Sequence, residues 1–381
     1  MRDDLGRWSH RQYERESRRL WWLEAWELGL YGMQARDVPD RRRTHLSFRA
    51  WNRVVRPALN DREWLHLTEN KLVFGRYYEA CGVPVPRTLG FVSRDAGHDR
   101  AGRPAPDFST LIDRLPGVET SGLVIKPVAG GTGHGVLVID RVRPSAGGQP
   151  AVAITSDGKE RTVEELEVVA EESFRGATGC VVQARESIHP WFAELSGGAP
   201  ASSIRVVTFR PDGSDPVIQM AVCRLGRRGQ MLENWARGGV AVGIQSQSGE
   251  LMRGHLKADG GCWVDEHPDS QIPLYGQVLP MWQEVRQLAL EAARVTPGLR
   301  SIGWDVFPTP DGPVIVEGNA NWDLQMMQLH HGGVIGTPVG DAWAAHGADL
   351  PDGERWHRRH DPRGLNWKGR AADRLRSIIA R

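Results

Sequence analysis

The segment at residues 301–323, SIGWDVFPTPDGPVIVEGNANWD, constrains the fold of this chain more than any other. Two runs of β-type residues flank a TPDGP sequence, whose prolines and Asp-Gly pair favour a hairpin turn. A turn about Asp311 places Asp305 opposite Glu317. Side chains on a strand repeat every two residues, so Glu317 and Asn319 share one face, about 5 Å from a cross-strand neighbour. The segment therefore predicts a β-hairpin on which three oxygen-bearing side chains converge.

This hairpin has two interpretations when it is considered alone. Two carboxylates as close as Asp305 and Glu317 repel each other, and one of them takes up a proton unless a cation lies between them. Magnesium prefers such sites, with one or two carboxylates from the protein and the rest of its shell from water and phosphate oxygens. The alternative is an exposed turn with ordinary charges, because a slip of the register by one residue would point Glu317 to the opposite face.

Length and composition limit the class of protein. The chain has 381 residues, enough for a substantial core divided over two or three domains. Its 48 Lys and Arg nearly balance 47 Asp and Glu, so no overall field favours nucleic acid or an anionic membrane. Neither an apolar signal core nor a run of roughly 20 apolar residues occurs, and we expect a cytoplasmic protein without a membrane segment. The sequence has four scattered cysteines, Cys81, Cys180, Cys223 and Cys262, with no Cys-x-x-Cys pair, which argues against a zinc site and a disulfide scaffold.

Patterns along the chain predict a mixed α+β organisation in four parts. Residues 1–67 combine Arg, Glu and large apolar residues, including six of the 15 tryptophans, and should form a helical N-terminal region. Residues 68–180 should begin with a helix that Gly82 stops, followed by strands and a glycine loop. Residues 181–345 should hold further strands, a helix and the hairpin. Residues 346–381 are a basic tail, either a solvated terminal helix or a contact for a phosphorylated or otherwise anionic substrate.

The glycine loop within VIKPVAGGTGHGVLVID has the composition of a phosphate-binding loop. It is followed by the β-branched run GVLVID, whereas a dinucleotide-binding fingerprint or a Walker A loop opens into a helix. We therefore expect a flap between two antiparallel strands, as in protein kinases, but no His-Arg-Asp or Asp-Phe-Gly sequence supports a kinase. Lys126 precedes the loop, and its burial in an apolar run is costly without an anionic partner. The alternative for Lys126 is an edge-strand lysine.

These motifs occur in an order that resembles a known family. The series is Asn70-Lys71, VIKP, GGTGHG, VVQARE, SSIRVVT, Asn234 with Gly238-Gly239, and GWDVF followed by VIVEGNANWD. It resembles the ATP-grasp superfamily, most closely the sugar-transfer associated ATP-grasp branch, over about residues 68–340. The resemblance implies an ATP-grasp fold in which two α+β subdomains, residues 68–180 and 181–345, clasp ATP. The helical N-terminal region departs from the family pattern, because ATP-grasp enzymes usually begin with a Rossmann-like domain that helps to bind the acyl substrate.

The resemblance also implies roles for individual residues. Gln183 would lie beside adenine and Glu186 would reach the ribose, and the full set that would bind ATP is Lys71, Lys126, Gly130, Gly131, Thr132, Gly133, Gly135, Gln183 and Glu186. Arg205 and Lys126 would be catalytic, since both would neutralise charge on the transferred phosphoryl group. Glu317 would bridge two magnesium ions, whose protein ligands would be Asp305, Glu317 and Asn319. The residues that would contact substrate are Asn234, Gly238, Gly239 and His189.

Four of the polar residues have structural alternatives. Asn234 could be a turn-capping amide instead of a substrate contact. His189 could cap the loop that follows the strand of Gln183, which would join the two subdomains, instead of lining an acceptor pocket. The pair His330-His331 lies just beyond the hairpin and could touch a substrate or act in proton transfer, but no zinc-type spacing accompanies it and a structural pair is the alternative.

The resemblance implies an ATP- and Mg²⁺-dependent carboxylate-amine or carboxylate-thiol ligase that forms an acylphosphate and releases ADP and phosphate. Its partners would be a small-molecule or peptide carboxylate and a nucleophilic acceptor, with no nucleic acid. One alternative is an ATP-dependent phosphotransferase that acts on a sugar or another hydroxyl acceptor. A second alternative is a non-catalytic ATP-binding module in a polysaccharide or natural-product pathway, although such a module need not keep three oxygen donors around the phosphates.

Overall fold

The computed structural model describes residues 9–34, 40–93, 95–115, 122–130, 135–143, 151–156, 158–173, 178–199, 201–229, 235–257 and 261–360. The chain divides into two compact units. The first unit combines Met1–Leu59 with Asp323–Arg381, and the second unit is Asn60–Trp322. The boundaries expected from the sequence, after residues 67, 180 and 345, stay a prediction. No helix in the described ranges is long and apolar enough to cross a lipid bilayer.

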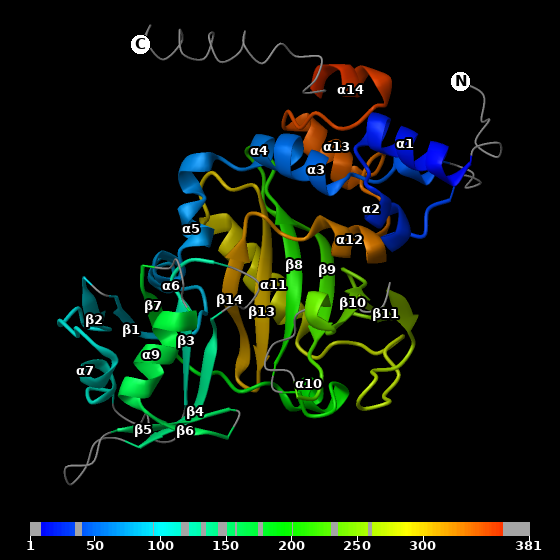
Figure 1. Cartoon of the computed structure of the whole chain (residues 1–381). Coiled ribbons are helices and arrows are strands. Elements are labelled where there is room, and N and C mark those ends of the chain that lie inside the picture. The colour runs from blue at the N-terminus through cyan, green and yellow to red at the C-terminus, as the bar shows by residue number, and fades with distance from the viewer. Residues whose placement is uncertain are drawn as a thin grey trace, which may run out of the picture. The chain divides into compact units, whose positions relative to one another are not determined.

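The N-terminal sheet of the second unit runs in the order β2-β1-β7-β3-β4-β5-β6, and its pairings are antiparallel. Along β3, Leu123 and Ile125 are buried while Val124 and Lys126 are half-buried, because successive side chains point to opposite faces. Helices α7 (Phe108–Ile112) and α9 (Val163–Ser173) contribute to the core of this sheet (Figure 1). The strands are β1 (Thr88–Val92), β2 (Gly97–Asp99), β3 (Leu123–Pro127), β4 (Leu137–Arg143), β5 (Val152–Thr155), β6 (Glu160–Thr162) and β7 (Cys180–Ala184).

The C-terminal sheet of this unit runs in the order β12-β11-β10-β9-β8-β13-β14 and is also antiparallel. Helix α11 (Trp282–Val295) packs against β8, β13 and β14 with a face of apolar residues at helical spacing. All residues of β8 are buried, so both faces of this central strand are covered. The strands are β8 (Ser202–Phe209), β9 (Val217–Leu225), β10 (Val240–Ile244), β11 (Leu251–Leu256), β12 (Cys262–Val264), β13 (Ser301–Thr309) and β14 (Gly312–Asn319).

Helix α6 (Lys71–Ala80) contacts a strand of each sheet, β1 and β14. The Asn70 side chain begins this helix by accepting hydrogen bonds from the backbone N–H groups of Leu72 and Val73, at 3.0 and 3.1 Å. The helix ends at the predicted place, because Gly82 adopts a left-handed φ of +75°. In the described residues of the unit, the other helical elements are η4 (Arg62–Trp64), α5 (His66–Glu69), α10 (Pro190–Leu195) and η5 (Trp235–Arg237).

The described part of the first unit is helical, which confirms the predicted helical N-terminal region. Its tryptophans pack between segments that are far apart in the sequence. The ring centroids of Trp22 and Trp356 are 4.6 Å apart, and those of Trp51 and Trp343 are 5.3 Å apart. These contacts help to explain the abundance of tryptophan. The elements are α1 (His10–Trp21), α2 (Ala25–Leu30), η2 (Arg41–Arg43), α3 (Phe48–Ala50), η3 (Trp51–Val55), α4 (Arg56–Leu59), α12 (Leu324–His331), α13 (Pro338–Ala345) and α14 (Glu354–His360).

Candidate functional site

The hairpin of β13 and β14 has the predicted register. Asp305 lies opposite Glu317, and Gly303 lies opposite Asn319. The turn ends at Gly312, whose φ of +126° is rarely adopted by other residues. This register places the three predicted magnesium ligands together on paired strands, as the alternation of side chains requires. The alternative of a slipped register is therefore wrong.

Asp305 is bound by two arginines from the neighbouring strands. Arg205 of β8 is the direct partner of Asp305 in the sheet, and its Nε and Nη2 atoms donate to Oδ1 and Oδ2, the second bond at 2.7 Å. Arg224 of β9 brings its Nη2 atom to 2.9 Å from Oδ1. Burial tends to raise the pKa of the Asp305 carboxyl, but the two guanidinium groups outweigh it and hold this pKa below its ordinary value. Asp305 is thus an ionised carboxylate in a buried cluster with two arginines.

The sequence did not single out Arg224. It lies in the strand sequence VIQMAVCRL, where it is the one charged residue in an otherwise largely apolar run. Its Nε and Nη2 atoms also donate to the Ser203 hydroxyl oxygen, at 3.1 and 2.7 Å. A buried charge in an apolar strand requires a partner. The same argument that drew attention to Lys126 would therefore have found Arg224.

Lys71 connects the hairpin to the strand that leads into the glycine flap. As the first residue of α6, it brings its Nζ atom to 3.4 Å from Oε1 of Glu317. The same Nζ atom donates to the backbone oxygen of Gly130 at 2.7 Å, and the backbone N–H of Lys71 donates to the oxygen of Val128 at 2.8 Å. A cation is therefore already held between the start of the flap and the second carboxylate of the hairpin.

The glycine loop joins β3 to β4, which are antiparallel, as predicted for a flap. Gly130 and Gly135 have φ values of +109° and +74°, so a turn at these two positions favours glycine. Lys126 lies opposite Val181 in the sheet, and its charge acts on the carboxyl group of Glu186. The other predicted flap residues, Gly131, Thr132 and Gly133, lie outside the described residues.

The residues predicted near the nucleotide base and the acceptor differ in their burial and in their hydrogen-bond and charge partners. Gln183 is buried in β7 between Thr88 and Val124. Burial raises the pKa of the Glu186 carboxyl, and the charge of Arg87 partly opposes this effect. His189 caps helix α10, because its Nδ1 atom accepts from the backbone N–H of Trp191 at 3.2 Å.

The capping contact of His189 supports the structural alternative for this residue, and a substrate contact stays a prediction. Gly238, with a φ of +97°, and Gly239 lead into β10. Asn234 lies outside the described residues. His330 and His331 are the last two residues of α12, in the first unit.

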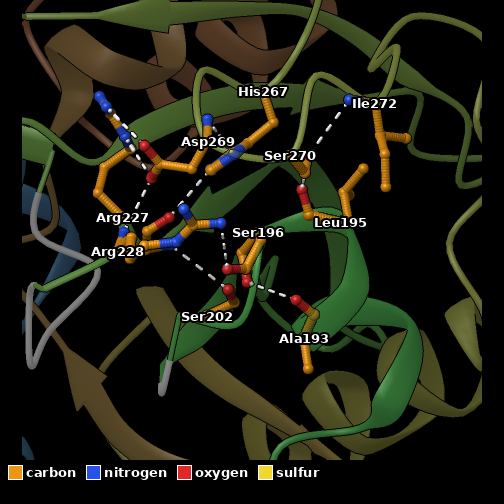
Figure 2. A network of polar contacts seen from close by, with 12 residues as sticks. Ala193, Leu195, Ser196, Ser202, Arg227, Arg228, His267, Asp269, Ser270 and Ile272 are labelled. Atoms are coloured by element: carbon orange, nitrogen blue, oxygen red, sulfur yellow. Dashed lines mark hydrogen bonds and ion pairs between the residues drawn. The ribbon is translucent and has the colours of Figure 1, made fainter.

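A second polar network fixes the end of β9, from which the chain continues toward the predicted substrate segment (Figure 2). Asp269 accepts from Nε of Arg227 at 2.7 Å and from the backbone N–H of Arg228 at 2.8 Å, and these contacts lower its pKa to about 2. His267 accepts at Nδ1 from the N–H of Asp269, so its Nε2 atom donates to the oxygen of Gly226 at 3.0 Å. Burial lowers the pKa of the His267 imidazole, which favours its neutral form. The network orders the chain before residue 230.

The donor set of the hairpin fits magnesium only in part. Carboxylate and amide oxygens are the donors that a hard cation prefers. Glu317 and Asn319 meet this requirement, whereas both oxygens of Asp305 already accept from arginine. In the described ranges, no group of three or more His, Cys, Asp or Glu side chains could hold a metal ion. The three predicted ligands would thus fit the ion after a donor has left Asp305.

Comparison with known protein families assigns the chain to one family. A family model described as Sugar-transfer associated ATP-grasp matches residues 51–338. The sequence matches no curated protein at a significant level.

Several solved structures resemble the chain at low identity. VanG D-Ala:D-Ser ligase from Enterococcus faecalis is 13% identical with a TM-score of 0.41, over 73% of this chain and 60% of that one. The D-alanine-D-alanine ligase from Coxiella burnetii is 14% identical with a TM-score of 0.38, over 74% and 59%. The ATP-grasp ligase PsnB, in complex with a phosphomimetic variant of a minimal precursor, Mg and ADP, is 15% identical with a TM-score of 0.39, over 76% and 62%. The matched part of each of these proteins is less than two thirds of its length.

Proposed function

The chain belongs to the sugar-transfer associated ATP-grasp family, and we propose that it is an ATP- and Mg²⁺-dependent carboxylate-amine or carboxylate-thiol ligase. Members of the ATP-grasp superfamily are ATP-dependent ligases. The reaction that we propose passes through an acylphosphate and releases ADP and phosphate. Its substrates would be a small-molecule or peptide carboxylate and a nucleophilic acceptor.

The observation that carries this proposal is the convergence of three cations on the carboxylates of one hairpin. Arg205 and Arg224 contact Asp305, and Lys71 contacts Glu317 while it also holds the first glycine of the flap. Phosphoryl transfer needs fixed positive charge around the equatorial oxygens of the transferred group, and little covalent chemistry from the protein. An arrangement of cations beside a glycine flap supports such a reaction.

The first step would join the carboxylate substrate to the γ-phosphorus. A carboxylate oxygen forms the new O–P bond, the bond from the γ-phosphorus to the bridging oxygen breaks, and ADP leaves. Arg205 would neutralise charge on the phosphoryl group, and Lys71 and Lys126 would hold the other phosphate oxygens. Magnesium, when bound by Asp305, Glu317 and Asn319, would supply further neutralisation of phosphate charge.

The second step would consume the acylphosphate. The lone pair of an amine or thiol attacks the acyl carbon, the bond from that carbon to the phosphate oxygen breaks, and inorganic phosphate leaves while the nucleophile loses a proton. No side chain of the protein has to act as a nucleophile. Gly238, Gly239 and Asn234 would contact the acceptor, and the network around Asp269 would hold the chain that leads to them.

Hydroxylamine trapping tests the proposal without knowledge of the natural acceptor. The protein is incubated with ATP, Mg²⁺, hydroxylamine and pooled carboxylates or peptides, and hydroxamate and ADP are measured together. The proposal predicts that they form in equal amounts, and that a variant with Asp305→Asn and Glu317→Gln forms neither. A stable phosphorylated hydroxyl compound would instead support the phosphotransferase. ATP binding with no turnover of any acceptor would support the non-catalytic module.

A further inference from the structure

Asp305 offers no unused acceptor position to a metal ion in the described arrangement. A carboxylate has about four lone-pair positions on its two oxygens. Oδ1 accepts from Nε of Arg205 and from Nη2 of Arg224, the latter at 2.9 Å. Oδ2 accepts from Nη2 of Arg205 at 2.7 Å and from Nδ2 of Asn319 at 3.3 Å. All four positions are therefore used, and three of the donors are guanidinium N–H groups.

The charges oppose a metal ion at this point as well. The guanidinium groups of Arg205 and Arg224 both face the single carboxylate of Asp305. The side chains of Asp305 and Arg205 are only 7% and 8% exposed, and water screens the charges poorly there. A divalent cation that approached Asp305 alone would meet both guanidinium groups at close range.

We propose that Arg205 and Arg224 occupy the place of the metal ion on Asp305, and that a divalent cation reaches Asp305 only together with a nucleotide polyphosphate, which draws Arg224 away. Arg224 is then a positioning residue that makes metal binding depend on nucleotide. This inference rests on the proposed function for the identity of the ligand. It goes beyond that function by assigning an order of binding and a residue that enforces it.

Arg224 is better suited than Arg205 to leave the carboxylate. Arg205 binds both oxygens of Asp305, whereas Arg224 binds Oδ1 through one nitrogen. The Arg224 side chain is 15% exposed, about twice as much as the 8% of Arg205. Its Nε and Nη2 atoms also donate to the Ser203 hydroxyl oxygen, at 3.1 and 2.7 Å, so Nη2 divides its contacts between a neutral hydroxyl and the carboxylate. Phosphate oxygens are strong acceptors for such a group and would compensate for the lost carboxylate bond.

The remaining ligands do not make a strong site by themselves. Glu317 shares its Oε1 atom with Nζ of Lys71 at 3.4 Å, and Lys71 offsets its charge. Asn319 brings an uncharged amide whose nitrogen is used by Asp305. A polyphosphate that arrived with its own cation would supply the missing oxygen ligands and would also attract Lys71, Arg205 and Arg224. Metal and nucleotide should therefore bind cooperatively.

The test is a titration of the full-length protein with Mn²⁺ as a spectroscopic substitute for Mg²⁺, with free Mn²⁺ measured by electron paramagnetic resonance. We expect the unmodified protein to bind Mn²⁺ at least tenfold more weakly without ADP than with ADP, after correction for the Mn²⁺ bound by ADP itself. Arg224→Met should raise the affinity for Mn²⁺ alone at least tenfold, because it frees one position on Oδ1 and removes one positive charge. A double variant with Asp305→Asn in addition should lose this gain.

Arg253 provides a matched control. It lies on β11 of the same sheet and pairs with Asp265, so Arg253→Met changes the net charge equally without touching Asp305. It should leave Mn²⁺ binding unchanged. If Arg224→Met does not fold, as judged by circular dichroism, Arg224→Gln keeps a donor for Ser203 and replaces it in the same comparison.

Two results would overturn the inference. One is micromolar binding of Mn²⁺ without nucleotide by the unmodified protein, and the other is an equal effect of the substitutions at Arg224 and Arg253. The ligase proposal is tested separately by hydroxamate formation. If the Mn²⁺ results agree and no hydroxamate forms, the role of Arg224 stands and the ligase proposal fails. If hydroxamate forms and Arg224→Met has no effect on Mn²⁺ affinity, the ligase proposal stands and the role of Arg224 fails.

Discussion

Replacement of Asp305 by Asn is the substitution that should disturb the site most clearly. The amide keeps the size of the carboxylate but loses its charge and one of its two acceptor oxygens. Arg205 and Arg224 would then be buried guanidinium groups without this carboxylate. Removal of one partner from a buried ion pair costs about 3–5 kcal/mol, and the full range applies here because the Asp305 and Arg205 side chains are only 7% and 8% exposed. We expect Asp305→Asn to lower the free energy of unfolding by about this amount.

Asp265→Asn is the control for that measurement. It breaks the ion pair with Arg253, whose two side chains are 70% and 50% exposed, and exposed pairs contribute about 0.2–1 kcal/mol. Both variants are compared with the unmodified protein by urea unfolding at pH 7, with tryptophan fluorescence and circular dichroism followed in parallel. Equal losses below about 1 kcal/mol for both variants would refute the description of Asp305 as the anion of a buried cationic cluster.

The pH dependence of the same variant has a defined sign. The folded-state pKa of Asp305 lies below its ordinary value of 3.8, so the unfolded chain binds more protons in that range. The stabilisation by the arginines is therefore fully present above about pH 4 and is lost as the pH falls through the folded-state pKa. Asp305→Asn lacks this contribution, and the stability difference between the two proteins should shrink below pH 4. A difference that stays constant down to pH 2 would contradict the assignment.

Three further predictions concern other residues. Burial raises the pKa of Glu27 from 4.5 to about 7, so stability should fall by up to about 3 kcal/mol as the pH rises from 4.5 to 7, and urea unfolding of Glu27→Gln should show no such slope. Lys71 contacts Glu317, and if it also binds phosphate, Lys71→Met should weaken ADP binding at least tenfold by calorimetry. An unchanged affinity for ADP would show that Lys71 is not part of the nucleotide site. The pKa of Asp269 is about 2, so the stability gained from its contacts is lost between about pH 4 and pH 2, and acid unfolding of Asp269→Asn should lack this step.

The local parts of the site could be predicted because short-range rules determine them. The alternation of side chains and the turn sequence together specify that Asp305 faces Glu317. A glycine beyond an apolar helical pattern predicted the end of α6 at Gly82. The β-branched run after the glycine loop predicted an antiparallel flap, and the pairing of β3 with β4 confirms it.

The contacts that could not be predicted depend on which strands become neighbours. Arg224 reaches Asp305 because β8 lies between β9 and β13, and strand order is not encoded in any local pattern. Lys71 meets Glu317 because α6 contacts β14, far away in the sequence. In the first unit, the same limitation applies to the pairing of Trp51 with Trp343. Sequence patterns identified the residue types of the site, and the sheet topology determined their partners.

The proposed reaction requires that a carboxylate attacks ATP and that its acyl group is then transferred to the acceptor while phosphate leaves. Its most direct test is an isotope-transfer experiment with the carboxylate that the hydroxamate screen identifies, labelled with ¹⁸O on both oxygens. The inorganic phosphate released in a complete reaction with acceptor is then analysed by mass spectrometry. An acylphosphate route predicts that each phosphate carries one ¹⁸O atom from the carboxylate. Phosphate without label, in a reaction that still forms product, would contradict the account.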